Sequence, residues 1–203
     1  MSVAIIDYGV GNLRSVEKAF QAGGVEACVS DEEGVLRSAE KLVLPGVGAF
    51  RACMEALQAR GFDRLVRERV EEGTALLGVC VGMQMLFEES EEFGTTSGLG
   101  LLRGRVRRFP DGLRVPQVGW NQVEWRSGHA LSEGISDRTF FYFVHSFFCE
   151  ADETAAVVGE TEYGIIYPSV VARGNVCGVQ FHPEKSQAAG LRLLKNFAEN
   201  HAG

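Results

Sequence analysis

Two residues in this sequence stand in settings that could support covalent catalysis, and the first is a cysteine. Cys80 lies in Gly78-Val79-Cys80-Val81-Gly82, between an apolar run at residues 75–79, typical of a buried strand, and a run at 84–89, typical of a helix start. A sharp strand-to-helix turn with small flanking residues would strain the backbone and make the sulfur stand out at the end of a sheet. The helix N-terminus would favour the thiolate, which is the reactive form. For this motif alone, a core cysteine is the alternative.

The second residue is His182, in Phe181-His182-Pro183-Glu184 at the end of an apolar run. Pro183 fixes its own φ and stops the strand, which leaves Glu184 able to hold one nitrogen of the imidazole. A carboxylate in that place presents the other ring nitrogen to a nucleophile in the correct tautomer. Without Cys80 the pair would indicate only a histidine capped by an acid. With Cys80 it indicates a Cys-His-Glu triad that the fold must assemble.

The remaining histidines are weaker candidates for the base. His129 is expected in a turn and His201 in the C-terminal tail. His145 stands among aromatic residues, in Phe143-Val144-His145-Ser146-Phe147, and this setting favours a partly buried wall of a site.

Two glycine-containing loops follow apolar runs near the start of the chain. In Pro45-Gly46-Val47-Gly48, glycines on both sides of Val47 would let backbone N–H groups approach a ligand, although an ordinary tight turn has the same composition. The loop at 8–12 lacks the pattern of a dinucleotide site, because Arg14 replaces the last glycine, and the P-loop lysine is absent. A surface loop that meets a partner is expected there.

The first half of the chain alternates strand and helix patterns. Strands are predicted at 3–7, 25–30, 41–44 and 75–79, and helices at 13–22, 31–38, 49–59 and 62–72. Such an alternation predicts an α/β fold of three layers, with a mostly parallel central sheet and helices on both faces. The acidic run at 88–94 is expected to be a solvated loop.

The second half is richer in short strands and turns. Strands are predicted at 101–109, 115–125, 139–146 and 155–161, and Gly174-Asn175 joins 170–173 to 176–181 as a hairpin. This half is therefore expected to be mixed or antiparallel. No linker or repeat divides the chain, so residues 1–203 are predicted to form a single domain.

Composition limits the function classes. The net charge is −7, from 20 basic and 27 acidic residues, which disfavours nucleic-acid binding, and no apolar run is long enough to cross a membrane. The start of the chain resembles a strand rather than a signal peptide. The five cysteines never form C-x-x-C, which favours reduced thiols in the cytoplasm over a zinc site. We expect no metal and no cofactor, and we expect Cys28, Cys53, Cys149 and Cys177 to be small buried residues.

Taken together, the three motifs around Val47, Cys80 and His182 resemble those of the class I (triad) glutamine amidotransferases, in the same order and across nearly the whole chain. Within that family, the strings at 7–12, 116–121 and 141–147 are similar to those of the glutaminase subunits of imidazole glycerol phosphate synthase, of histidine biosynthesis. Gln117 departs from the pattern, which usually has histidine there.

The resemblance implies a glutaminase mechanism. Cys80 would attack the side-chain amide of L-glutamine to give a glutamyl thioester, His182 would transfer protons, and Glu184 would orient His182. The N–H groups of Val81 and of the Pro45–Gly48 loop, that of Val47 in the first place, would bind the oxyanion. The resemblance also places Gly48, Gln84, His145 and Ser146 in the glutamine pocket. Gln84 follows Cys80 by one helical turn, which independently places it on the same face.

The resemblance further implies a (β/α)8 synthase (cyclase) subunit that receives the ammonia through a channel, in a heterodimer. It places the contact face near Asn12, Arg14, Trp120, Asn121 and Lys185. For Trp120, an exposed interface anchor and a core position are both compatible with the sequence.

Three alternatives remain open from the sequence. A cysteine hydrolase acting on glutamyl peptides would use the same Cys80–His182 pair. A glutaminase could serve another synthase, which the strings at 118–121 and 144–146 disfavour. A non-catalytic regulatory module is disfavoured because Cys80, His182 and Glu184 are all present.

Overall fold

The computed structural model describes residues 2–126 and 128–200 of the chain. Its central sheet has the strand order β2 (Ala27–Ser30), β1 (Val3–Ile6), β3 (Lys41–Gly46), β4 (Ala75–Cys80), β13 (Val176–Val179), β12 (Ile166–Arg173), β11 (Val157–Glu162), β8 (Gln117–Trp125) and β9 (Thr139–His145).

The strands from β2 to β13 are parallel neighbours and form the buried centre of the fold. Every residue of β1, β3, β4 and β13 is buried. Such strands read as continuous apolar runs because helices cover both faces of a parallel sheet. The predicted parallel centre is confirmed.

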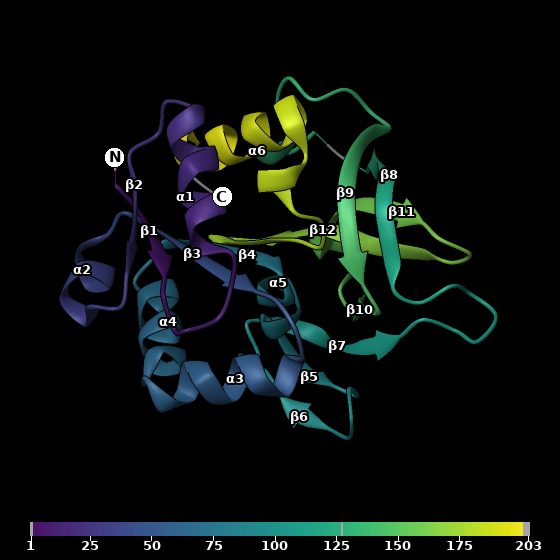
Figure 1. Ribbon diagram of the computed structural model, residues 1–203, viewed down its shortest axis with the longest axis horizontal. Coiled ribbons are helices and arrows are strands. Elements are labelled where there is room, and N and C mark those ends of the chain that lie inside the picture. Colours follow the sequence, from purple (N-terminus) through teal and green to yellow (C-terminus); the bar gives the residue numbers. More distant parts are fainter. Residues whose placement is uncertain (1, 127, 201–203) are drawn as a thin grey trace.

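The helices pack on both faces of this sheet. Figure 1 shows α1 (Leu13–Ala22) and α6 (Gln187–Glu199) on one side, and α3 (Phe50–Ala59) and α4 (Phe62–Glu71) on the other. The short helix α2 (Glu33–Ser38) lies next to α4, and α5 (Val81–Met85) follows β4. The predicted three-layer α/β architecture is therefore confirmed.

The C-terminal half extends the sheet with antiparallel strands, as predicted. β12 and β13 form a hairpin in which Arg173 pairs with Val176, and Gly174 at the turn has a φ of +56°. β11, β8 and β9 continue the sheet with antiparallel pairing. Short 3-10 turns occur at η1 (Ala130–Ser132), η2 (Thr154–Ala156) and η3 (Pro183–Lys185).

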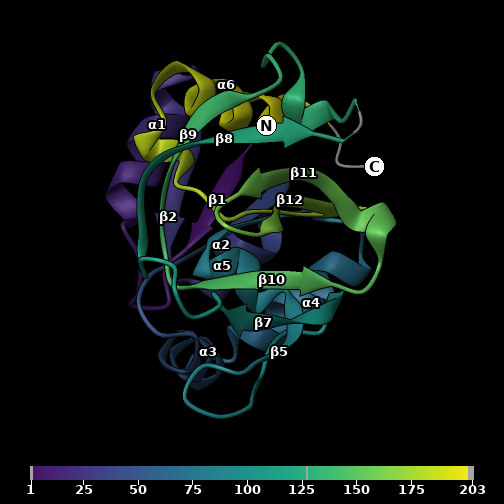
Figure 2. The same cartoon turned by 90° about the vertical axis from the view of Figure 1, so that its right-hand side faces the viewer.

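A second sheet corrects the expectation for residues 84–94. It has the order β10 (Phe147–Ala151), β7 (Leu102–Arg108), β5 (Phe87–Ser90) and β6 (Thr96–Ser97), and it lies below β11 and β12 in Figure 2. The helix predicted over 84–89 ends at Met85, because Phe87 pairs with Leu102 of β7 and is buried in the core. The predicted solvated loop over 88–94 therefore begins as a strand, since tertiary pairing outweighs local preference.

Burial corrects one further expectation. Cys53, Cys149 and Cys177 are buried as predicted, whereas Cys28 is exposed. Cys28 lies in β2, at the edge of the central sheet, where one side of the strand has no neighbour. Among the helices of residues 2–126 and 128–200, none is long and apolar enough to cross a membrane.

Candidate active site

The candidate nucleophile, base and loop meet because three neighbouring parallel strands end together. β4 lies between β3 and β13, and the register places Gly46 opposite Cys80. On the other side, Val79 pairs with Val179, so the chain after β13 leads directly past Cys80 to His182. The carboxyl ends of parallel strands are the usual place for ligand sites in α/β folds.

Cys80 occupies a strained turn between β4 and α5. Its φ is 56° and its ψ is −113°, a combination that residues with side chains rarely adopt. The glycines around it make the turn possible, because a Cβ atom on Gly82 would lie 1.9 Å from the carbonyl oxygen of Leu44, and one on Gly78 would lie 2.7 Å from the carbonyl oxygen of Gly82. The strained strand-to-helix turn with small flanking residues is as the sequence predicts.

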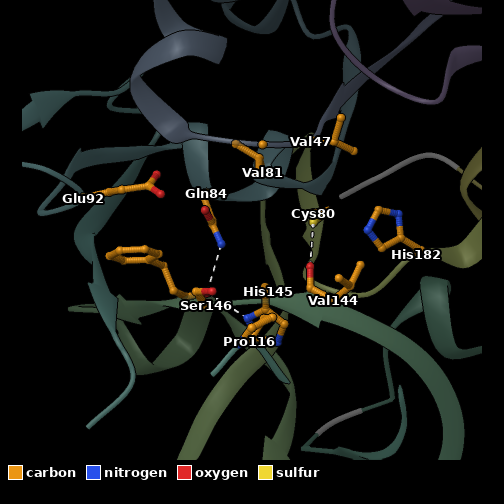
Figure 3. Close-up of a pocket in the computed structure, with 12 residues that line it drawn as sticks. Val47, Cys80, Val81, Gln84, Glu92, Pro116, Val144, His145, Ser146 and His182 are labelled. Carbon is orange, nitrogen blue, oxygen red and sulfur yellow. Dashed lines mark hydrogen bonds between the residues drawn. The ribbon is translucent and has the colours of Figure 1, made fainter. Parts of the chain in front are cut away.

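His182 and Glu184 form a buried pair. Nδ1 of His182 lies 2.8 Å from Oε1 of Glu184, and their side chains are 4% and 1% exposed. Burial by itself would lower the pKa of His182, but interactions with Cys80 and Glu184 stabilise the imidazolium and raise that pKa to about 10. Nε2 of His182 has no hydrogen-bond partner among the described residues. Figure 3 shows the ring beside Cys80.

The position of His182 depends on β9. The His182 N–H donates to the carbonyl oxygen of Tyr142 at 2.9 Å, and the Ser186 hydroxyl donates to the carbonyl oxygen of His182 at 2.7 Å while accepting from the Tyr142 N–H at 3.0 Å. Phe181, one residue earlier, stacks on Phe141 of the same strand with ring centroids 4.1 Å apart. β9, a strand of the antiparallel half of the sheet, therefore holds His182 in place next to the parallel half.

A cavity of about 260 Å³ opens in front of these residues (Figure 3). It is small for a ligand pocket and suits a ligand the size of a single amino acid. Its lining contains residues predicted from the sequence: Val47, Gly48, Cys80, Val81, Gln84, His145, Ser146 and His182. Glu184 lies behind His182, outside the lining.

The lining also contains residues that the sequence analysis missed, namely Glu92, Pro116, Val144 and Phe147. Glu92 falls in the acidic run that was expected to be solvated. Instead, its Oε2 accepts the N–H of Phe50, at the first turn of α3, at 2.7 Å. Ala49 provides no side-chain cap for that helix, so the free N–H group there is a signal that could have indicated an acidic partner.

Side chains behind the Pro45–Gly48 loop hold its backbone. Tyr8 belongs to the loop at 8–12, which is expected to meet a partner, but its side chain is buried. Its hydroxyl donates to the carbonyl oxygen of Pro45 at 2.6 Å. The Cys53 thiol donates to the carbonyl oxygen of Val47 at 3.3 Å. The Val47–Gly48 peptide is trans, so its N–H points opposite to its carbonyl group. Because the Val47 carbonyl faces Cys53, the Gly48 N–H points away from Cys53. The loop is therefore oriented before any ligand binds.

His145 forms a buried wall of the cavity. Its Nδ1–H donates to the carbonyl oxygen of Phe147 at 2.8 Å, and its Nε2 lies 3.2 Å from the hydroxyl of Tyr167, which contacts Oε1 of Gln117 at 2.9 Å. Burial lowers the pKa of His145 to about 4, in spite of the hydrogen bond to Phe147. Gln117, the departure from the family pattern, thus lies behind His145, to which Tyr167 connects it, and it is not among the residues that line the cavity.

The other two histidines lie apart from the cavity or outside the described structure. The Nδ1 of His129 accepts the N–H of Leu131 at the start of η1, in a turn as expected. His201 lies outside the described residues.

The predicted contact residues lie on the surface, except that Asn121 is half-buried. Trp120 is 45% exposed, which decides against the core alternative. The Trp120 ring meets the Tyr142 ring edge to face at 6.1 Å, and Nζ of Lys185 lies over the same Tyr142 ring at 5.7 Å. Asn12 and Arg14 are exposed at the start of α1, which packs beside η3. The side-chain amide of Asn121 donates a hydrogen bond to the carbonyl oxygen of Glu162 at 2.9 Å.

In the part of the chain that the structure describes, no group of three or more His, Cys, Asp or Glu side chains is arranged to hold a metal ion. The groups that the cavity offers for chemistry are the thiol, the imidazole–carboxylate pair and backbone N–H groups.

Comparison with known proteins agrees with this geometry. The family model "Glutamine amidotransferase class-I" matches residues 4–200. The chain is 50% identical over 195 residues to "Imidazole glycerol phosphate synthase subunit HisH" of Symbiobacterium thermophilum, covering 96% of this chain and 92% of that protein. It is also 50% identical over 203 residues to the protein with the same description from Moorella thermoacetica, covering 99% and 97%.

Solved structures show the same fold. A structure described as "Crystal structure of glutamine amidotransferase" superposes with a TM-score of 0.77 at 26% sequence identity and covers 97% of both chains. A chain of "Structure of PurLQS from Thermotoga maritima" also has a TM-score of 0.77, at 19% identity, covering 97% of this chain and 96% of that one.

Proposed function

The chain belongs to the class-I glutamine amidotransferase family, and from that premise we propose that Cys80, His182 and Glu184 hydrolyse L-glutamine to L-glutamate and ammonia. The enzyme is the glutaminase subunit of an imidazole glycerol phosphate synthase. The observation that carries the proposal is the strained Cys80 turn that lines the cavity, beside the buried His182–Glu184 pair at 2.8 Å.

The reaction starts from the ion pair in which Nε2 of His182 holds the proton and Cys80 is the thiolate, since a pKa of about 10 keeps His182 protonated at neutral pH. The thiolate adds to the side-chain amide carbon of glutamine, which gives a tetrahedral oxyanion. The imidazolium then donates its proton to the amide nitrogen as the C–N bond breaks, so ammonia leaves and a glutamyl thioester remains. His182 next removes a proton from water, which attacks the thioester, and glutamate and the thiol are released. Glu184 keeps Nδ1 of His182 protonated throughout.

Backbone N–H groups stabilise the oxyanion. One belongs to Val81, the first residue of α5, and the other belongs to the Pro45–Gly48 loop, with Val47 as the first candidate. Each such donor is worth roughly 3–4 kcal/mol in the barrier. Tyr8 and Cys53 support this function because they fix the carbonyl groups of the same loop.

The cavity recognises glutamine along its length. Figure 3 shows Glu92 on the opposite side of the cavity from His182, with Gln84 between them. When the amide carbon lies at Cys80, the α-ammonium group can reach the Glu92 carboxylate, which provides the opposite charge. Gly48, Gln84, His145 and Ser146 line the path between the two ends. A carboxylate at this place favours free glutamine over glutamine within a peptide, which has no α-ammonium group.

Free ammonia is lost easily, so the glutaminase works with a synthase. The partner is a (β/α)8 cyclase subunit, and the heterodimer yields imidazole glycerol phosphate and aminoimidazole carboxamide ribotide in the cytoplasm. Trp120 and Lys185 are exposed and contact the half-buried Tyr142, whose carbonyl oxygen accepts the His182 N–H. Asn12 and Arg14 are exposed at the start of α1, which packs beside η3. This side of the molecule, with Asn121, is the proposed contact face.

The experiment that tests the function measures glutamate release from glutamine by the chain alone, with the (β/α)8 subunit, and with that subunit and its ribonucleotide substrate. We expect glutamate release to rise with the partner and to rise further when the partner is liganded. An equal rate of glutamate release with and without the partner would indicate a hydrolase that works alone. No release in any mixture, with a partner that is active on ammonia, would contradict the glutaminase reaction.

Replacing Lys185 by alanine is expected to weaken assembly about tenfold while the chain keeps its fold, because Lys185→Ala removes an exposed cation that packs on Tyr142 at the contact face. Titration calorimetry with the synthase subunit measures the affinity. Lys195→Ala is the matched control, since Lys195 is equally a lysine on the surface but lies on α6 and pairs with Glu199 at 3.6 Å. Unchanged affinity and unchanged stimulation in Lys185→Ala would contradict the assigned face.

A further inference from the structure

Gln180 lies beside Cys80 because their strands end at the same level. β13 pairs in parallel with β4, with Val179 opposite Val79, so Gln180 and Cys80 are the next residues along two neighbouring strands. The Gln180 side chain is completely buried. The mechanism above gives it no role, and a buried primary amide requires hydrogen-bond partners.

The hydrogen bonds around Gln180 determine which way its amide points. Nε2 of Gln84 lies 3.0 Å from the carbonyl oxygen of Phe147 and 3.0 Å from Oε1 of Gln180. A backbone carbonyl only accepts, so the Gln84 atom beside Phe147 must be the nitrogen. Its second N–H then requires an oxygen from Gln180, which turns the Gln180 nitrogen to the other side. That nitrogen lies 3.9 Å from Sγ of Cys80.

We infer that Gln180 is a catalytic residue that donates an amide N–H to the sulfur of Cys80 and stabilises the thiolate, with Gln84 holding it in the donating orientation. This inference rests on the proposed glutaminase function. While Nε2 of His182 holds the proton, the electron pair is on the sulfur and the N–H dipole of Gln180 faces this negative charge. In a buried site such an interaction is stronger than it would be in water.

Two substitutions separate the donor role from packing. Gln180→Glu keeps the length of the side chain and an oxygen for Gln84, but it puts a second oxygen against the sulfur in place of the N–H. Gln180→Met replaces the amide with an apolar side chain of similar length. Gln58→Glu is the matched control for the change of charge, because Gln58 is exposed on α3.

The first readout is the rate at which iodoacetamide alkylates Cys80 as a function of pH, followed by mass spectrometry of the Cys80 peptide. All variants carry Cys28→Ser, because Cys28 is the exposed cysteine. Cys80 is buried like Cys53, Cys149 and Cys177, but it alone among these four lines the cavity. We expect the pH of half-maximal rate to rise by about one pH unit in Gln180→Met, the scale of one lost hydrogen bond to a charged group. It should rise further in Gln180→Glu, whose carboxylate repels the thiolate. Gln58→Glu should follow the parent.

The second readout is glutamate release in the presence of the liganded synthase subunit. At pH 7 we expect about a tenfold loss in Gln180→Met, with recovery towards the parent as the pH rises and the thiolate forms without help. A packing defect would not recover with pH.

Alkylation profiles that coincide with the parent in a folded Gln180→Glu or Gln180→Met protein would overturn the inference. Failure of both variants to fold would overturn it too, because a donor to the sulfur controls reactivity and not the fold. The proposed function fails separately, if the Cys28→Ser parent releases no glutamate with its partner. The alkylation profiles do not depend on that result.

Discussion

Replacing Cys80 by serine is expected to lower glutamine-dependent product formation by the assembled synthase at least about a thousandfold, because the covalent route then lacks its nucleophile. A hydroxyl is a far weaker nucleophile than a thiolate. The substitution also removes the sulfur whose interaction helps to raise the pKa of His182. The measurement compares product formation with glutamine and with an ammonium salt as nitrogen source.

The ammonium-dependent rate separates loss of chemistry from loss of assembly. In Cys80→Ser it should stay close to that of the parent, because the synthase site lies on the other subunit. Cys28→Ser, at an exposed cysteine away from the cavity, should keep both rates. Glutamine-dependent synthesis that survives in Cys80→Ser would show that another group is the nucleophile.

Replacing Glu184 by glutamine is expected to lower kcat/KM for glutamine about a hundredfold and to change its pH dependence. Loss of the carboxylate removes the partner that holds Nδ1–H of His182 at 2.8 Å, so the ring is no longer fixed in the productive tautomer. It also removes one of the groups that stabilise the imidazolium, so the pKa of His182 falls from about 10.

The sign of the pH effect follows from the role of the proton. The imidazolium must donate to the departing ammonia, so activity is lost when the pH rises through the pKa of His182. The descending limb of the kcat/KM profile should therefore lie near pH 10 in the parent and at lower pH in Glu184→Gln. A reduced rate with an unmoved descending limb would mean that Glu184 acts on something other than the charge of His182.

Local sequence patterns predicted the central part of the fold. The buried strands before Pro45 and Cys80 and the hairpin at Gly174 have strong local signals, and the structure places strands there. The order of the strands has no such signal. The hairpin strand β13 inserts beside β4 through contacts between distant parts of the chain, and this insertion brings His182 to Cys80.

The errors share one cause, which is long-range pairing. Phe87 leaves the helical pattern because β7 offers a partner strand, and Glu92 turns inward because the first turn of α3 has a free N–H group. Cys28 is exposed because its strand became the edge of the sheet. Local sequence contains none of these partners. That residues 1–203 form a single domain, and that the residues of the site have their assigned roles, stay predictions.

Delivery of ammonia by this subunit can be tested by following the amide nitrogen of glutamine into the product. The assembled synthase receives glutamine labelled with ¹⁵N at the amide, together with an excess of unlabelled ammonium, and the imidazole product is analysed by mass spectrometry. We expect a product that carries the label well above its proportion in the bulk ammonium, because the ammonia released at Cys80 passes directly to the synthase site. A product labelled only in proportion to the bulk ammonium would contradict delivery by this subunit.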